Sequence, residues 1–355
     1  MADPSDRPQV EDVIVDARGS DAFETCSESP LRHPEQGQRS GGVTNCFTSR
    51  TKFVIRNLRC DDIPELIALP RDEGREMGQE PEILSWLNID PSGIFVGENE
   101  ENGEVIGCCC GIALSDTHGY IGMYVVKPKF RGLGLGRVLW NAAINRLGNR
   151  NVSLSSASKM LGFYRGKAGF SFTAKWTVDL YVATNPILLS NASSRPLPFT
   201  IVVEPEGLLV QHVINYDYSV HKYDRSTIVK ETIREAGTLT LMAIEPSIDV
   251  NLKVTGYACM KKGLQGHWLI APVYAEDYSS ARSLVHGLMN ALSDDQLKEG
   301  VVAKLVSSNY EAAKLFHQIG MKKSPYQLQR LFTKEVFEIP ENKIFALQSS
   351  VFCSE

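Results

Sequence analysis

Three glycines alternate with other residues in a short loop that could bind phosphate groups through its main chain. Gly132, Gly134 and Gly136 stand between a predicted strand and a predicted helix. Without Cβ atoms, such a loop can turn its backbone N–H groups inward and let a ligand approach closely. The first N–H groups of the following helix have no partner within the helix, and the helix dipole favours an anion there. The pattern therefore predicts a site for a phosphate-bearing ligand.

The spacing of this loop excludes two common nucleotide-binding motifs. A P-loop ends in Gly-Lys-Ser/Thr, whereas Gly136 is followed by Arg137 and Val138. The dinucleotide-binding fingerprint has the spacing G-x-G-x-x-G, whereas this loop has G-x-G-x-G. A loop that is merely flexible stays an alternative.

The residues around the loop are basic, although the whole chain of 355 residues carries a net charge of −5. No Asp or Glu occurs from residue 117 to residue 178, while the same stretch holds 10 lysines and arginines. Such a patch fits a polyanion such as coenzyme A, which carries a pyrophosphate and a ribose phosphate. Nucleic acid would also fit, but no recognition helix, zinc finger or RNA-binding motif accompanies the patch. Solvated helix faces would explain the lysines but not the missing carboxylates.

The elements that must position the loop form a mixed α/β domain. Apolar runs of period two, bounded by turn residues, indicate strands, and the strand at 119–126 leads directly into the loop. The predicted strands are 53–58, 94–99, 103–114, 119–126, 151–156 and 172–182. The predicted helices are 60–70, 136–147 and 159–167.

The chain divides into a tail and two domains. Residues 1–51 have no sustained period and are predicted to be disordered; the first domain follows at 52–182, and Pro, Ser and Asn mark 183–198 as a linker. The second domain, 199–355, looks like a diverged copy of the first. Three segments align in the same order: 105–114 with 254–263, 136–147 with 281–292, and 163–170 with 315–321. Two unrelated α/β domains are the alternative.

The loop and its surroundings resemble the GNAT superfamily of N-acetyltransferases. The diagnostic motif of that superfamily is R/Q-x-x-G-x-G/A after a strand that often ends V-x-P, and here residues 131–136 read RGLGLG after VKP at 126–128. The FY…GF element at 163–170 resembles the later helix and final strand of the family. The second half resembles the divergent second domain of tandem GNAT proteins. The segments that carry that resemblance are 217–225, 271–277, 307–321 and 330–335.

The resemblance implies two GNAT-like domains, each a mixed central sheet flanked by helices, with acetyl-CoA as the acyl donor of the first. The strand backbone before the loop would pair with the pantetheine arm, and the loop amides would hold the pyrophosphate. The residues implied are Val125, Val126, Arg131, Gly132, Leu133, Gly134, Leu135, Gly136 and Arg137. The thioester would lie at a gap between two splayed strands, where an amine attacks it directly and backbone N–H groups stabilise the oxyanion.

The second domain departs from the motif at the aligned position. Residues 276–281 read EDYSSA, which lacks all three glycines and adds two carboxylates. Because those charges would repel a pyrophosphate, we expect that the second domain does not bind coenzyme A in this way. It would shape the acceptor pocket or support the first domain.

Amine attack needs a base, and often an acid that protonates the departing thiolate. The resemblance implies Tyr164 as the acid, although the spacing to Gly169 would also allow Phe163 to occupy that position. The base could come from Asp116, His118, another strand, the second domain or ordered water. The consecutive cysteines 108–110 are interpreted as strand core rather than as nucleophiles. No Cys-x-x-Cys spacing or Cys/His cluster predicts a metal.

These observations predict an acetyl-CoA-dependent N-acetyltransferase that acts on a small-molecule or peptide amine. A non-catalytic acyl-CoA-binding protein or sensor is the alternative. No run of about 18 apolar residues predicts a transmembrane helix, and residues 1–16 lack a signal-peptide pattern. With scattered, reduced cysteines, we expect an intracellular protein, in the cytoplasm or the nucleus, without membrane or nucleic-acid partners.

Overall fold

A computed structural model describes residues 52–188, 200–245, 252–349 and 351–355. The predicted tail at 1–51 and most of the predicted linker lie outside these residues. Among the described helices, none is long and apolar enough to cross a membrane.

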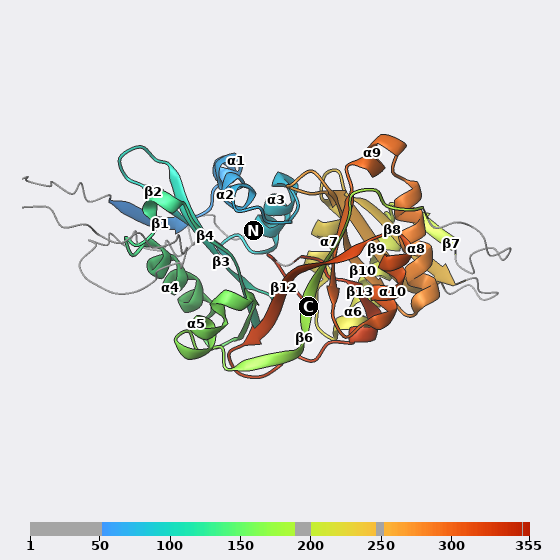
Figure 1. Ribbon diagram of the computed structural model, residues 1–355. Coiled ribbons are helices and arrows are strands. Elements are labelled where there is room, and N and C mark those ends of the chain that lie inside the picture. The colour runs from blue at the N-terminus through green and yellow to red at the C-terminus, as the bar shows by residue number, and fades with distance from the viewer. Residues whose placement is uncertain (1–51, 189–199, 246–251, 350) are drawn as a thin grey trace, which may run out of the picture.

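The first half of the chain contains six strands and the helices between them (Figure 1). The strands are β1 Phe53–Asn57, β2 Ile94–Asn99, β3 Val105–Ala113, β4 His118–Val126, β5 Asn151–Ala157 and β6 Phe172–Ala183. The α-helices are α1 Ile63–Leu66, α2 Ala68–Asp72, α3 Glu80–Ile89, α4 Leu135–Leu147 and α5 Leu161–Gly166. The short 3-10 helices are η1 Cys60–Asp62, η2 Pro128–Phe130 and η3 Ser158–Met160.

The second half repeats this succession of elements. Its strands are β7 Thr200–Val203, β8 Leu239–Glu245, β9 Lys253–Lys262, β10 Trp268–Ala275, β11 Val301–Val306, β12 Lys322–Phe332 and β13 Ile344–Ala346. Its helices are α6 Leu208–His221, α7 Ser226–Arg234, α8 Tyr278–Asn290, α9 Asp294–Lys298, α10 Tyr310–Gln318 and the 3-10 helix η4 Glu341–Lys343. In the first half the predicted strands and helices are confirmed, except that the predicted helix 60–70 is divided among η1, α1 and α2, and α3 was not predicted. In the second half, α6 was likewise not predicted.

Within the described residues, thirteen strands form one continuous sheet. Their order is β1-β2-β3-β4-β5-β12-β6-β11-β10-β9-β8-β7, and β13 pairs with β10 off this path. The order reads the same from both ends when each strand of one half is exchanged for its counterpart in the other. This symmetry confirms the repeat, and with it the expected mixed sheet flanked by helices in each half, although the two sheets are joined into one.

The two halves exchange their last strands. β6 lies between β12 and β11, while β12 returns to pair antiparallel with β5, from Leu328 opposite Ala157 to Phe332 opposite Ser153. Figure 1 shows β6 and β12 crossing the middle of the molecule. The domain ranges 52–182 and 199–355 therefore stay a prediction, because the sheet does not divide between them.

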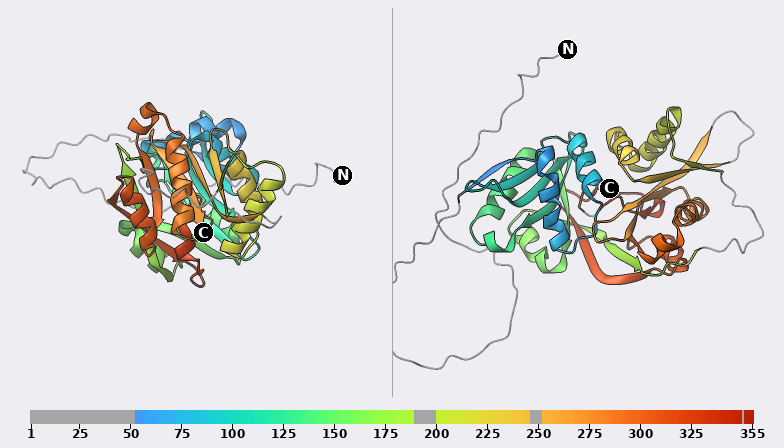
Figure 2. Two further views of the ribbon diagram at one scale, coloured as in Figure 1. Left: turned by 90° about the vertical axis from the view of Figure 1, so that its right-hand side faces the viewer. Right: turned by 90° about the horizontal axis from the view of Figure 1, so that it is seen from above.

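Helices cover both faces of each half (Figure 2). In the first half, α1 to α3 pack on one face of the sheet, and α4 and α5 pack on the other. The apolar stripe of α4 rests on β3, where a Cβ at Gly111 would lie 2.7 Å from the Ala143 carbonyl oxygen. In the second half, α8 and α10 cover one face, and α6 and α7 cover the other. Glycine at position 111 thus sets how closely the helix behind the loop approaches the sheet.

Charged groups are buried where the halves meet. Lys261 of β9 lies 3.4 Å from Glu82 of α3 and 2.9 Å from Glu235, and all three side chains are at most 5% exposed. Burial alone would lower the pKa of Lys261, but the two carboxylates outweigh it and raise that pKa. Loss of one partner would leave a buried charge without compensation, which destabilises the folded state. This cluster therefore fixes α3 against the second half.

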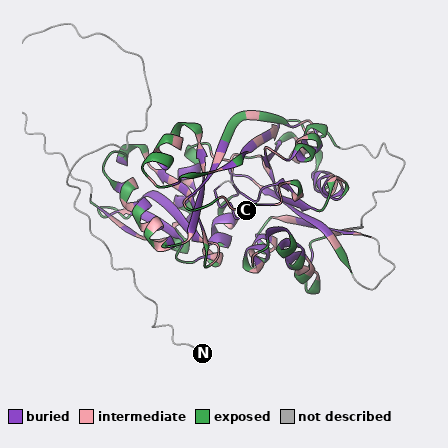
Figure 3. Ribbon diagram, turned by 90° about the horizontal axis from the view of Figure 1, so that it is seen from below, coloured by how far each residue is buried: buried purple, intermediate pink, exposed green. Residues whose placement is uncertain are grey.

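The last residues of the chain, 351–355, are buried between the halves. Figure 3 shows the end of the chain surrounded by buried ribbon. Phe352 stacks on Trp86 of α3 with ring centroids 5.0 Å apart, and Glu355 is only 3% exposed.

The strand exchange predicts that the halves stay together after the connection between them is cut. A protease site inserted within residues 189–199 should, after cleavage, give two fragments that elute as one species under native conditions. The reason is that β5, β12, β6 and β11 remain hydrogen-bonded across the cut. Size-exclusion chromatography measures this, and the same sample in denaturant is the control for complete cleavage. Fragments that separate in native buffer would contradict the exchange.

Candidate functional site

The glycine loop presents an open backbone at the start of α4. Gly132 and Gly134 have φ of +78° and +88°, and a Cβ at either would meet nothing within 4 Å. Gly134 is the N-cap of α4, and no side chain accepts a hydrogen bond from the first amides of the helix. Since those amides also lack intrahelical partners, the loop and helix start can offer several N–H groups to one anion.

The third glycine serves a different purpose. A Cβ at Gly136 would lie 2.5 Å from the hydroxyl oxygen of Tyr124 on β4. The Tyr124 ring also packs against Trp140 of α4, with centroids 5.8 Å apart. Glycine at 136 therefore lets a phenol from the strand reach the first turn of the helix. Tyr124 was not predicted as a site residue, since nothing in the local sequence shows which way a strand residue near a bulge points.

A β-bulge deforms β4 beside the loop. Cys108 of β3 pairs with Val125, whereas Cys110 pairs with Gly122, so β4 contains an extra residue. Met123 lies in this bulge with φ of +43°. A bulge bends its strand and turns backbone groups out of the ladder, so N–H groups near Tyr124 can point away from β3.

Strands β4 and β5 part after a short parallel contact. They pair only from His118 opposite Asn151 to Tyr120 opposite Ser153. Beyond Tyr120, β4 continues to Val126 without β5, while β5 stays paired with β12 on its other side as far as Ala157. The resulting gap runs along Val125 and Val126 and ends at the glycine loop. It matches the gap between splayed strands that the sequence resemblance implied.

The second half has the same gap, but the chain itself fills it. β10 and β11 pair over three residues and then part. β13 lies in the opening, with Val273 opposite Ala346 and Tyr274 opposite Ile344, and the Leu347 amide donates to the Lys304 carbonyl of β11 at 2.8 Å. The start of α8 is closed as well.

A carboxylate caps α8 where the first half leaves its helix open. The Asp277 side chain accepts a hydrogen bond from the Ser280 amide at 2.8 Å, and Glu276 pairs with Lys343 at 2.8 Å. A polyanion would meet both carboxylates there. These contacts support the expectation that only the first half binds coenzyme A at its helix start.

Comparisons with known proteins agree with this geometry. The model of the acetyltransferase (GNAT) family matches residues 60–170, and that of an acetyltransferase (GNAT) domain matches residues 213–346. The chain belongs to the GNAT acetyltransferases. It carries two GNAT domains in tandem, as the repeat predicted. The curated protein sequences contain no significant match to it.

Solved structures share this tandem fold at low sequence identity. A Pyrococcus horikoshii protein described as a candidate acetyltransferase superposes with a TM-score of 0.63 and 14% identity, over 88% of this chain and 99% of that one. A tandem GNAT protein from the clavulanic acid biosynthesis pathway gives 0.54 and 12% identity, over 79% and 98%. The glucosamine N-acetyltransferase region of a fungal β-N-acetylglucosaminidase gives 0.51 and 14%, over 80% and 38%. At these identities the likeness shows the fold alone.

The charge around the first GNAT domain's loop is more balanced than its sequence suggested. Residues 117–178 contain no carboxylate. However, acidic residues from elsewhere in the chain form ion pairs with several lysines and arginines of this stretch. The pairs are Lys127 and Lys129 with Glu104, Arg131 with Glu73, and Arg146 with Asp90. The interpretation of an uncompensated basic patch is therefore wrong at these four cations, because the sheet brings together residues far apart in sequence.

Arg131 holds the loop in place. Its Nε donates to the Val126 carbonyl at 2.8 Å, and its own amide donates to the Pro128 carbonyl at 3.2 Å. The side chain thus ties the end of β4 to the beginning of the loop.

Tyr164 faces the interior, whereas Phe163 is half-buried. Tyr164 packs against Trp140 and Phe170, with centroids 5.5 and 6.2 Å apart. Burial, with a smaller contribution from nearby Cys109, raises the pKa of Tyr164 to about 12. The phenol therefore stays protonated at neutral pH, which is the state that a general acid requires.

The two polar residues at the start of β4 lie away from the gap. Five residues separate His118 from Met123, which is about 16 Å along an extended strand. The Nδ1 atom of His118 lies 2.8 Å from the Thr117 hydroxyl, and its ring packs on Phe337. Burial lowers its pKa. Neither His118 nor Asp116 is placed to accept a proton at the bulge.

The consecutive cysteines belong to the core of β3. All three are fully buried, and the Cys108 thiol donates to the Met123 carbonyl at 3.0 Å. Burial raises the pKa of Cys108 to about 12 and those of Cys109 and Cys110 well above the usual thiol value. Among the described residues, no group of His, Cys, Asp and Glu could hold a metal ion.

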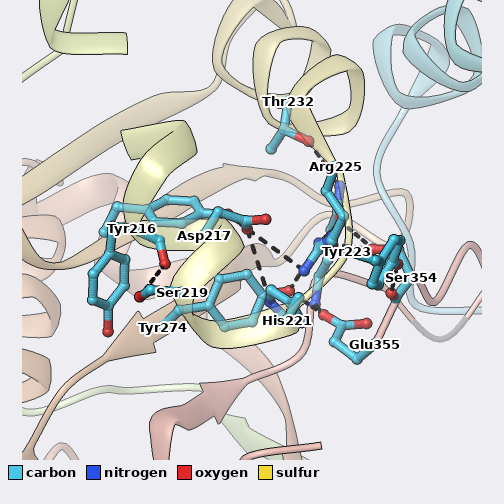
Figure 4. Close-up of polar contacts among 12 residues, drawn as sticks. Tyr216, Asp217, Ser219, His221, Tyr223, Arg225, Thr232, Tyr274, Ser354 and Glu355 are labelled. Atoms are coloured by element: carbon cyan, nitrogen blue, oxygen red, sulfur yellow. Dashed lines mark hydrogen bonds and ion pairs between the residues drawn. The ribbon is translucent and has the colours of Figure 1, made fainter. Parts of the chain in front are cut away.

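A second polar cluster lies in the second GNAT domain, facing the first (Figure 4). Tyr257 donates to Asp217 at 2.6 Å, and Arg225 lies 3.5 Å from the same carboxylate. Tyr274 donates to the Glu355 carboxylate. Asp217 and Arg225 belong to the segment 217–225. The sequence of this segment resembles the second domain of tandem GNAT proteins, but the resemblance implied no function for its residues. Only the fold shows that they face the centre.

The buried thiols predict that no acyl-enzyme forms on a cysteine. Alkylation of the native protein at mildly basic pH should leave residues 108–110 unmodified, because raised pKa values and burial suppress the thiolate. Peptide mapping by mass spectrometry measures this, and exposed Cys60 is the internal control. Alkylation of any of the three at the rate of Cys60 would restore a nucleophilic role.

Proposed function

We propose that this protein is an acetyl-CoA-dependent N-acetyltransferase that transfers the acetyl group directly to an amine of a small molecule or a peptide. The observation that carries the proposal is the open gap between β4 and β5, which ends at the uncapped start of α4. The same gap is closed by β13 and Asp277 in the second domain. One domain therefore has the donor site, and the other does not.

The residues of the glycine loop and of the end of β4 fit acetyl-CoA as the acyl donor. Its pyrophosphate would accept hydrogen bonds from amides of Gly132, Leu133, Gly134, Leu135, Gly136 and Arg137. Left-handed φ at two of these glycines and open space above them leave room for phosphate oxygens. The pantetheine arm would take the place beside Val125 and Val126 that β13 takes beside β10. Coenzyme A would thus complete the free edge of β4.

The chemistry is a single displacement at the thioester. The amine nitrogen forms a bond to the carbonyl carbon, the carbon–sulfur bond breaks, and the amine loses a proton to a base or to water. Backbone N–H groups turned out by the bulge near Met123 would stabilise the oxyanion. Tyr164 would donate its proton to the departing thiolate. Tyr124 is a second phenol close to the same place.

The same gap would also serve a protein that binds an acyl-CoA without transferring the group. Amine-dependent release of free coenzyme A separates this alternative from catalysis. We further propose an intracellular location, in the cytoplasm or the nucleus. The free thiols of the described cysteines support it, since such thiols are typical of reducing compartments.

Gly134→Glu should weaken acetyl-CoA binding about tenfold or more. A carboxylate at this position would stand where the phosphate oxygens bind, and like charges a few ångströms apart repel strongly. Calorimetric titration measures the change. Gly266→Glu is the matched control, because Gly266 also has left-handed φ and open space but lies in the second domain. Equal binding by wild type and Gly134→Glu would place the donor elsewhere.

Tyr164→Phe should lower kcat about a hundredfold while acetyl-CoA still binds, since loss of a general acid has effects of this order. Because the pKa of Tyr164 is raised to about 12, the phenol should stay protonated and cause no loss of wild-type activity until the pH approaches that value. Steady-state kinetics against pH measure both. A loss in Tyr124→Phe but none in Tyr164→Phe would transfer the acid role to Tyr124.

A further inference from the structure

The segment 351–355 lies against the one face of β4 from which an acceptor can reach the gap. Helices α4 and α5 cover the opposite face with a packed apolar core. On the open face, Val351 and Phe352 pack with Met123 and Val125 of β4. A Cβ at Gly122 would lie only 1.8 Å from the Val351 carbonyl oxygen. The chain therefore passes directly beside the bulge, where the amine would have to stand.

The main chain of this segment is held by side chains of the second half. Arg330 of β12 donates to the carbonyls of Cys353 and Glu355, and Tyr223 donates to the carbonyl of Ser354. Arg330 also stacks over Tyr120 of β4, 4.7 Å from the ring centroid. Bonds to carbonyls do not depend on side-chain identity, so another peptide following the same course could form them.

The side chain of Glu355 enters a polar pocket of the second domain. Its carboxylate accepts hydrogen bonds from the Tyr274 hydroxyl and, at 2.6 Å, from the Gln348 amide. Arg225 lies beside it, over the Tyr274 ring, and holds the Ser354 hydroxyl at 2.8 Å. Figure 4 shows these groups converging on the end of the chain. The pocket thus binds an acidic group.

The pocket contains more hydrogen-bonding capacity than the segment uses. Several atoms, each buried, have no hydrogen-bond partner among the described residues. They are Oδ1 of Asp217, both ring nitrogens of His221, and Nε and Nη1 of Arg225. Two of them, Nη1 of Arg225 and Nε2 of His221, face the Asp217 carboxylate at 3.5 and 3.8 Å, beyond hydrogen-bond distance. These side chains are at most 3% exposed. Buried polar atoms are costly to leave unpaired, so anchoring one glutamate does not account for this set.

The direction and length of the segment define what could replace it. Its amino-terminal end lies at the bulge, and its acidic side chain lies four residues later, a span of at most about 14 Å. We propose that residues 351–355 occupy the acceptor channel, and that the acceptor is a short acidic peptide that displaces them. Its α-amine stands at the β4 bulge, and its carboxylate takes the place of Glu355. This inference rests on the proposed function, because it takes the bulge as the place of acyl transfer.

Alkylation of Cys353 measures displacement of residues 351–355 and does not require catalysis. Its thiol is fully buried, and withdrawal of the segment would expose it to alkylation. The probe is the amidated pentapeptide Val-Phe-Ser-Ser-Glu, with free amino terminus, and its control is the same peptide ending in Gln. In wild-type protein without acetyl-CoA, the acidic probe should raise the alkylation rate of Cys353 about tenfold, and the Gln peptide should leave it unchanged.

A pair of variants tests the competition directly. Glu355→Gln should bind the acidic probe about tenfold more tightly, because the segment loses its charge-assisted bonds. The matched control is Glu338→Gln, an equal change of charge at an exposed residue outside the pocket. Equal alkylation with both peptides, or unchanged alkylation in wild type and Glu355→Gln, would overturn the proposal.

The failure of this proposal and the failure of the proposed function can be told apart. The alkylation assay contains no donor, whereas the Gly134→Glu titration contains no acceptor. If the acidic probe exposes Cys353 and is acetylated at its α-amine when acetyl-CoA is added, the proposal stands. If it exposes Cys353 but is never acetylated, while another amine is acetylated by the same sample, the channel is not the acceptor site. If no amine is acetylated, the proposed function fails instead.

Discussion

The early parting of β4 and β5 is the constraint on which the open edge in the first domain depends. β5 lies parallel to β4 for only three residue pairs before it turns to β12. The remaining edge of β4 therefore carries backbone donors and acceptors without a neighbouring strand. The backbone N–H and C=O groups of a buried strand edge need hydrogen-bond partners. Here the fold leaves space for a partner other than a strand. The proposed donor site is thus a gap in the hydrogen bonding of the sheet, with the glycine loop at its end.

The second domain shows what happens to such a gap when the loop changes. Its strands part in the same manner, but β13 takes the edge of β10 and Asp277 caps the following helix. The same geometry is therefore open in one copy and closed by the chain itself in the other. What the second domain contributes instead is its opposite face, where Arg225 and Tyr274 hold Ser354 and Glu355.

Features that depend on local sequence could be predicted, and features that depend on distant pairing could not. Gly132 and Gly134 are recognisable because left-handed φ requires glycine locally, and the strands follow from their apolar periodicity. The exchange of β6 and β12 leaves no local trace, because either strand would suit either neighbour. The carboxylates of Glu73, Glu104 and Asp90 lie outside the stretch that they neutralise. The burial of residues 351–355 was equally hidden, since a short segment without period reads as a tail.

The exchange of last strands also governs how the chain can fold during synthesis. The first domain contains its own glycine loop and helices, yet the strand that pairs with β5 begins about 140 residues after β6 ends. At ordinary rates of about 5–20 residues per second, the ribosome needs roughly 7–30 s to deliver it. Throughout that interval β5 has an open edge, of the kind that invites pairing with other chains. The protein therefore cannot mature one domain at a time, and its two halves become native together.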